Sequence, residues 1–170
     1  MIILGNGGHA KVIRDLPPAE GTVVAIGDNA TRKRVVEEQQ EQKGSGPFTT
    51  FATFATLVHP TAWVSPSATI GEGTVVMAGA VVQAAAVIGA HCIINTGASV
   101  DHDCVLGDYV HISPGAHLGG TVTVGEGAWV GIGACVKQGM KIGAWSRVGA
   151  GAAVVKEVAE GVTVKGVPAR

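Results

Sequence analysis

The stretch that decides the fold runs Ile88-Gly-Ala-His-Cys-Ile-Ile-Asn-Thr-Gly-Ala-Ser-Val-Asp-His-Asp-Cys-Val-Leu106, and every sixth residue in it is a branched aliphatic. The same spacing extends in both directions without a miss. A helix repeats at about 3.6 residues and a half-buried strand at about 2, so neither explains this period. A period of six indicates the hexapeptide form of a parallel β-helix. The aliphatic positions are Val64, Ile70, Val76, Val82, Ile88, Ile94, Val100, Leu106, Ile112, Leu118, Val124, Val130, Val136, Ile142, Val148 and Val154.

Each hexapeptide supplies one short strand and one corner, and three of them close a triangular coil of about eighteen residues. Residues one coil apart are expected to stack inside the prism, as in the column Val64, Val82, Val100, Leu118, Val136 and Val154. Glycine is expected at the corners, where φ is positive. A second inward position follows four residues after each aliphatic and is mostly small: Ala68, Thr74, Ala80, Ala86, Cys92, Ala98, Cys104, Ala116, Ala128 and Ala134.

The composition is that of a folded chain of one or two small domains, with 170 residues, 46% hydrophobic residues and a net charge of −1. This balance gives no reason to expect a nucleic-acid partner. No apolar run reaches membrane length and no signal peptide precedes the first strand, so we expect a cytoplasmic protein without membrane association. Cys92 and Cys104 fall on the small inward position and Cys135 lies beside it, so structural thiols are favoured over a disulfide or zinc site.

Residues 1–58 lack the hexapeptide period and predict a small parallel α/β domain before the β-helix domain of residues 59–170. We expect strands at residues 1–4, 22–26 and 48–58, with a loop over residues 41–47. Helices are expected from Val12 and, capped by Asn29 or Thr31, through Gln40.

The first strand of this domain ends in the glycine-rich turn Gly5-Asn6-Gly7-Gly8. A strand, a glycine-rich turn and a helix start make a cradle whose backbone N–H groups face a phosphate. A tight turn without any ligand uses the same residues, so the motif alone is a weak signal.

Polar and titratable residues are densest in the middle of the repeat region. His102 occupies a corner, between Asp101 and Asp103. A carboxylate on each side raises the basicity of an imidazole and can fix its tautomer, as suits a general base. The alternatives are a solvated corner residue and a metal site shared with His111 and His117, although spacings of nine and six put these on different or stacked sides.

The tryptophans Trp63, Trp129 and Trp145 are the only ones in the chain, and Trp129 and Trp145 lie outside the inward positions. We expect them to pack between prisms, with contact to a ligand as the alternative.

The chain resembles the left-handed β-helix acyltransferases. More narrowly, it is similar to the family of sialic-acid O-acetyltransferases and nucleotide-linked amino-sugar N-acetyltransferases, over nearly its whole length. The fold class implied is mainly β, a left-handed parallel β-helix preceded by a small, shortened Rossmann-like α/β domain. The residues that carry the resemblance are Ile3-Leu-Gly-Asn-Gly-Gly-His-Ala-Lys-Val12, Val24-Ala-Ile-Gly-Asp-Asn29, Leu57-Val-His-Pro60, Asn95-Thr-Gly97, His102-Asp-Cys104, His111-Ile-Ser-Pro-Gly-Ala116 and Gly166-Val-Pro-Ala169.

The resemblance implies a homotrimer whose active sites lie between adjacent prisms, with acetyl-CoA along the prism and no metal. By residue match, His102 is the catalytic base and Asp103 its acidic neighbour. The acetyl-CoA contacts implied are His111 at the acetyl end and the backbone of Gly120, Ile132 and Ala150. The substrate residues implied are Gly5, Asn6, Gly7 and Gly8 for the diphosphate of a nucleotide-linked sugar, together with Asp28, Asn29 and Asn95.

One departure concerns the segment between Asp15 and Gly27, which is too short for the further strand that family members have there. That strand ends in acidic residues that contact the nucleoside, so its loss weakens the inference to a particular nucleotide more than the inference to acetyl transfer.

The expected reaction is direct attack of a sugar amine on the thioester, without an acyl-enzyme, because Cys104 points inward. His102 accepts the proton, and backbone N–H groups near Gly119 or Gly120 are candidates to stabilise the oxyanion. The acceptor expected is a nucleotide-linked 4-amino-4,6-dideoxy sugar of surface glycan biosynthesis. The alternatives are an O-acetyltransferase on a sialic-type sugar and a non-catalytic or metal-binding hexapeptide protein.

Overall fold

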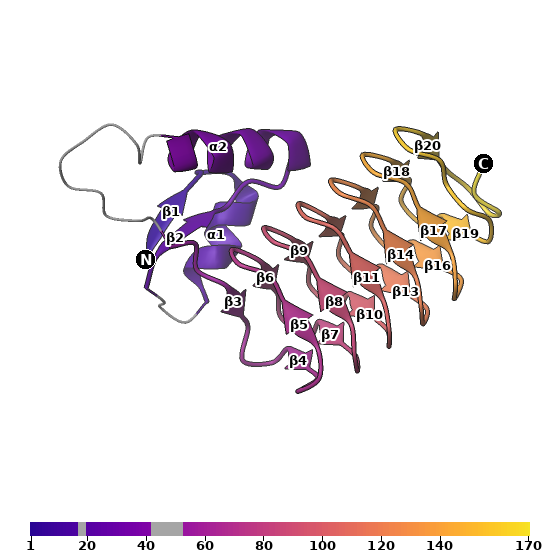
Figure 1. Ribbon diagram of the computed structural model, residues 1–170, viewed down its shortest axis with the longest axis horizontal. Coiled ribbons are helices and arrows are strands. Elements are labelled where there is room, and N and C mark those ends of the chain that lie inside the picture. The colour runs from indigo at the N-terminus through magenta and orange to yellow at the C-terminus, as the bar shows by residue number, and fades with distance from the viewer. Residues whose placement is uncertain (17–19, 42–52) are drawn as a thin grey trace.

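The computed structural model describes residues 1–16, 20–41 and 53–170. The chain forms a parallel β-helix, with a small α/β unit beside its first coils and the C-terminus at the far end (Figure 1). The predicted mainly β architecture is therefore confirmed.

The β-helix consists of two-residue strands, which the described residues arrange in three parallel sheets of seven, six and five strands. Each strand pairs with the strand one coil away, so that Val64 pairs with Val82 and Val100 with Leu118. This register confirms the predicted inward column. The strands are β3 (Leu57–Val58), β4 (Trp63–Val64), β5 (Thr69–Ile70), β6 (Val75–Val76), β7 (Val81–Val82), β8 (Val87–Ile88), β9 (Ile93–Ile94), β10 (Ser99–Val100), β11 (Val105–Leu106), β12 (His111–Ile112), β13 (His117–Leu118), β14 (Thr123–Val124), β15 (Trp129–Val130), β16 (Cys135–Val136), β17 (Lys141–Ile142), β18 (Arg147–Val148), β19 (Ala153–Val154) and β20 (Thr163–Val164).

The core of the prism is built from the two inward positions of the repeat. The aliphatic residues from Val76 to Val154 are buried, and the predicted small residues from Ala80 to Ala134 pack among them. Cys92 and Cys104 are buried as expected, whereas Cys135 is exposed, and all three are free thiols.

The corners adopt positive φ as predicted, but glycine does not occupy all of them. Gly97 and Gly115 have φ of 64° and 63°, while His91, Asp103 and Tyr109 hold φ of 54°, 57° and 59°. A non-glycine residue pays a steric cost in this conformation, which aspartate tolerates better than most. These corners therefore hold non-glycine residues despite the steric cost of a positive φ.

The α/β unit contains β1 (Ile2–Leu4), α1 (Gly8–Arg14), β2 (Thr22–Val24) and α2 (Asn29–Glu41). Strands β1 and β2 are parallel. No strand lies between α1 and β2 in the described part of that connection, which lacks residues 17–19. The expected capping residue was wrong, because the Asp28 carboxylate, rather than Asn29 or Thr31, caps α2 by accepting a hydrogen bond from the Thr31 N–H at 2.9 Å.

The predicted third strand over residues 48–58 is only partly testable, because residues 42–52 lie outside the described residues, as does most of the predicted loop. Phe54 forms a single parallel bridge to Thr22. Leu57 and Val58 instead pair with β6 and begin the first sheet of the β-helix.

Two hydrophobic clusters among the described residues join the α/β unit to the β-helix, and Val24 and Val36 pack with Tyr109 in one of them. Ala10 and Ile13 of α1 pack with Val75, Met77 and Ile93, which point outward from β6, the β6–β7 corner and β9. Among the described helices, none combines the length and the apolar character that crossing a membrane requires. The division into domains at residue 58 remains a prediction.

The inward and outward positions of one strand predict opposite responses to truncation. Leu106→Ala removes a side chain that is 2% exposed, and should lower the free energy of unfolding by about 2–5 kcal/mol because a cavity remains. The control Val105→Ala, at a residue 45% exposed on the same strand, should cost less than about 1 kcal/mol. Chemical denaturation measures both, and equal losses would contradict this inward–outward assignment.

Candidate functional site

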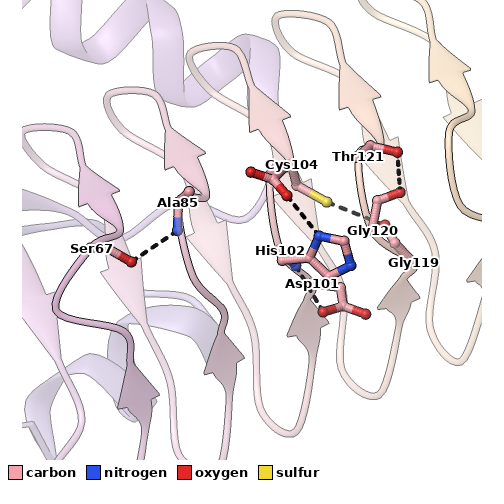
Figure 2. Close-up of polar contacts among 9 residues, drawn as sticks. Ser67, Ala85, Asp101, His102, Cys104, Gly119, Gly120 and Thr121 are labelled. Atoms are coloured by element: carbon pink, nitrogen blue, oxygen red, sulfur yellow. Dashed lines mark hydrogen bonds and ion pairs between the residues drawn. The ribbon is translucent and has the colours of Figure 1, made fainter.

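The predicted base, His102, lies on the exposed corner between β10 and β11. Its Nδ1 is 2.7 Å from Oδ2 of Asp103, and its backbone N–H donates to Oδ1 of Asp101 at 2.8 Å (Figure 2). The hydrogen bond to Asp103 raises the pKa of His102, and the charge of Asp101 adds to this effect. Asp103 therefore fixes the proton on Nδ1 and leaves Nε2 free to accept one.

The imidazole of His102 lies against the backbone of Gly120, one coil further on (Figure 2). A Cβ at position 120 would be 2.5 Å from Nε2 of His102, so a side chain there would displace the ring from this position. The N–H of Gly119 donates to Val136 O at 2.9 Å and is not available to an oxyanion. Among the described residues nothing accepts a hydrogen bond from the Gly120 N–H, which leaves Gly120 as the better of the two predicted candidates.

Cys104 stands beside this pair but faces the core. Its Sγ donates to Gly119 O at 3.3 Å, and burial raises the pKa of the thiol. A protonated, inward-facing thiol is a poor nucleophile, in agreement with the direct attack expected from the sequence.

His111 on β12 is buried, with 6% of its surface exposed. Its Nε2 is 3.1 Å from Nδ2 of Asn95, and its ring stacks on Trp129 at 5.5 Å between centroids. Burial lowers the pKa of His111 to about 3, with further lowering from Arg32 and His9 and an opposing effect from the Gly27 backbone. The ring is therefore neutral at physiological pH.

The structure thus brings the predicted residues Asn95 and His111 into contact. His117 instead places Nδ1 2.8 Å from Ser99 Oγ. Within the described residues no three His, Cys, Asp or Glu side chains are grouped to hold a metal ion.

A mainly apolar groove of about 320 Å³ runs along the outer face of β15 and β18. Two predicted acetyl-CoA contacts, Ile132 and Ala150, line it, and Ile132 is 62% exposed. Trp129 forms part of its wall, where its Nε1 donates to Ser113 Oγ at 2.7 Å. The third predicted backbone contact, Gly120, lies apart from these residues, beneath His102.

The glycine-rich turn lines a second cavity of about 450 Å³. Gly5, Asn6, Gly7 and Gly8 form one side of it and residues 25–27 the other. Gly5 has φ of 121°, and a Cβ there would lie 2.7 Å from Ala25 O, so this turn requires glycine.

Asp28 and Asn29 line a narrow cleft next to the groove rather than the cavity of the glycine-rich turn. The Asp28 carboxylate caps α2, as described above. Asn29 is buried, donates from Nδ2 to Gly127 O at 3.0 Å, and accepts at Oδ1 from Arg32. Asn29 therefore holds α2 on the β-helix.

Sequence reasoning missed Arg32, which is 2% exposed and anchors α2. Its guanidinium donates to the carbonyls of His91 at 2.9 Å, Tyr109 at 2.7 Å and Ile26 at 2.9 Å. It also missed His9, whose Nε2 is buried without a hydrogen-bond partner among the described residues, and burial lowers the pKa of His9 to about 4. No local signal marks Arg32, because its partners on the β-helix, the carbonyls of His91 and Tyr109, lie 59 and 77 residues away in the chain.

Comparison with known proteins agrees with this architecture. Residues 85–120 match the family described as bacterial transferase hexapeptide (six repeats). The chain also superposes on the acetyltransferase domain of PglB from Neisseria gonorrhoeae FA1090 with a TM-score of 0.90 and 36% identity, over 99% of this chain and 97% of that one. The chain belongs to the left-handed β-helix acetyltransferases with hexapeptide repeats.

The names of two further relatives state their substrates. Perosamine N-acetyltransferase from Caulobacter crescentus, solved as a histidine variant in complex with CoA and GDP-perosamine, is 36% identical with a TM-score of 0.89, over 99% of this chain and 94% of that one. UDP-N-acetylbacillosamine N-acetyltransferase from Bacillus subtilis (strain 168) is 44% identical over a match that spans 45% of this chain. That match covers 50% of the length of the curated relative.

The hydrogen bond between Asp103 and His102 predicts a measurable change in the pKa of His102 when Asp103 is replaced. Asp103→Asn should lower the pKa of His102 toward its ordinary value, because the hydrogen bond to a carboxylate is the main cause of the raised pKa. Asn tolerates the positive φ at this corner, so the fold should survive. NMR titration of the His102 ring checks this, with Asp101→Asn as a comparison expected to shift the pKa less. An unchanged pKa in Asp103→Asn would contradict the pairing.

Proposed function

We propose that the protein is an acetyl-CoA-dependent N-acetyltransferase that acts on the amine of a nucleotide-linked 4-amino-4,6-dideoxy sugar in surface glycan biosynthesis. The observation that carries the proposal is the pair of His102 and Asp103, 2.7 Å apart on an exposed corner above Gly120. The names of the relatives support the acceptor, since they specify N-acetylation of UDP-N-acetylbacillosamine and of perosamine.

The amine attacks the thioester carbonyl directly and forms a tetrahedral intermediate. Nε2 of His102 accepts the proton from the attacking nitrogen, while Asp103 supports the imidazolium through Nδ1. Gly120 lies beside the imidazole, and its N–H, which donates to none of the described residues, is the donor assigned to the oxyanion. When the intermediate collapses, the C–S bond breaks and the thiolate of CoA takes the proton from His102.

Acetyl-CoA is assigned to the groove lined by Trp129, Ile132 and Ala150, whose apolar wall suits an uncharged arm. A PglB acetyltransferase domain of the same fold has been solved with acetyl coenzyme A. The exposure of Ile132 supports a homotrimer in which an adjacent prism closes the groove. The nearby pair of His111 and Asn95 is assigned to the acetyl end of the donor and to the substrate.

The diphosphate of the sugar nucleotide is assigned to the cavity beside Gly5–Gly8, in the α/β domain of residues 1–58. The β-helix domain of residues 59–170 carries the base. Three free cysteines support a reducing, cytoplasmic location.

His102→Ala should lower turnover at least about 100-fold with little effect on folding, because it removes a positioned base from an exposed corner. His117→Ala, on the outward side of β13, should retain turnover. The assay uses acetyl-CoA with nucleotide-linked 4-amino sugars. Near-wild-type turnover of His102→Ala would remove the base from this role, and acetylation of free sialic acid alone would favour O-acetyl transfer.

The pairing of His102 with Asp103 also predicts the pH profile of kcat/KM. A base works in its neutral form, so kcat/KM should rise with pH through the pKa of His102, and this limb should lie above the ordinary histidine value of 6.5. In Asp103→Asn the limb should move to lower pH, because the neutral form then persists to lower pH. Identical profiles for the two proteins would contradict the assignment.

A further inference from the structure

The outward residues of one sheet form a stacked row that leads away from His111. In the parallel register, His111 on β12 lies next to Trp129 on β15, and Trp129 next to Arg147 on β18. The rings of His111 and Trp129 are 10° from parallel, and Cζ of Arg147 lies 5.8 Å from the centroid of the Trp129 ring. A buried neutral ring therefore sits at one end of the row and an exposed cation at the other.

Arg147 lines both the apolar groove and the narrow cleft beside Asp28. It is the one cationic side chain among the described residues that line either space. Within the described part of the chain, no carboxylate lies within 4.0 Å of its guanidinium. Asp28, which shares the cleft, caps α2 through Oδ1, and the charge of Arg147 contributes to lowering the pKa of Asp28 without an ion pair between them. The guanidinium N–H donors of Arg147 therefore have no ion-pair partner among the described residues and are available to a ligand.

A guanidinium held over an indole ring by a cation–π contact keeps its N–H donors free for a ligand. These donors form a planar fork that matches two oxygens of a phosphate group. The aromatic face already restricts the arginine side chain, so binding costs less conformational entropy. The remaining groove wall is apolar, so the charged end of a long ligand would find its counter-charge at this position.

We propose that Arg147, supported by the ring of Trp129, binds a phosphate group of a substrate held in the groove or the adjoining cleft. The inference rests on the proposed function and adds a recognition residue that the sequence motifs did not indicate. The phosphate belongs to the acyl donor, because the diphosphate of the sugar nucleotide is assigned to the cavity beside Gly5–Gly8, which Arg147 does not line. Binding measurements distinguish the two sources.

The test compares Arg147→Ala, Arg147→Lys and the control Lys141→Ala with the wild type. Lys141 is an exposed cation at the equivalent strand position six residues earlier, on a different sheet. Calorimetry measures the Kd of each protein for CoA, for pantetheine, which has the same arm without phosphate, and for a nucleoside diphosphate of the acceptor type. Circular dichroism confirms that each variant is folded.

Arg147→Ala is expected to raise the Kd for CoA about 10- to 100-fold, because a charge-assisted hydrogen bond is lost. Pantetheine should stay within about twofold, Arg147→Lys should be intermediate, and Lys141→Ala should be unchanged. A loss confined to the nucleoside diphosphate would overturn the assignment of the phosphate to the acyl donor.

Unchanged affinities in Arg147→Ala would overturn the inference, and so would an equal loss for CoA and pantetheine, because Arg147 would then only support Trp129. In both cases wild-type binding would leave the proposed function intact. A wild type that binds neither CoA nor nucleotide would instead contradict the proposed function and the inference with it.

Discussion

The parallel pairing of each strand with the strand one coil away is the constraint on which the rest of the structure depends. It makes residues eighteen positions apart neighbours, as the register of Ser99 with His117 illustrates. Outward side chains consequently stack in rows along each face, while inward ones fill the core. The site uses this geometry twice, because His102 rests on Gly120 and because His111, Trp129 and Arg147 form one row. The framework that buries the core also sets the spacing of the reacting groups.

The corners supply the second level of organisation. At one corner Asp103 takes a positive φ and places its carboxylate on Nδ1 of His102. At two other corners, one coil apart, the carbonyls of His91 and Tyr109 accept hydrogen bonds from the buried Arg32 of α2. A buried guanidinium is costly unless its donors are satisfied, so this contact fixes α2 and the Ile26–Gly27 segment on the β-helix. The cavity of the glycine-rich turn is thereby held in a defined position relative to the β-helix.

Periodicity alone predicted the β-helix, its inward column and the corner position of His102, because these depend on spacing within the repeat. The pairing of His102 with Asp103 was also predictable, since the two residues adjoin in sequence. The contacts by which Asn29 and Arg32 hold α2 on the β-helix could not be predicted, because their partners there lie 59 to 99 residues away. The place of Trp129 in the groove wall was left open, because an outward aromatic residue fits packing between prisms, which we expected, as well as contact with a ligand, the alternative. The prediction of the α2 cap was wrong because Asp28, Asn29 and Thr31 lie within four residues of one another and are all of types that cap helices.

The central claim is that His102 takes the proton from a sugar amine held against the thioester. A crystal structure of the protein with CoA and a nucleotide-linked 4-amino sugar tests it most directly. The account predicts that the amino nitrogen lies within about 3 Å of Nε2 of His102, with the CoA sulfur beside it. An amino nitrogen held by other groups, with no path to His102 directly or through one water, would contradict it.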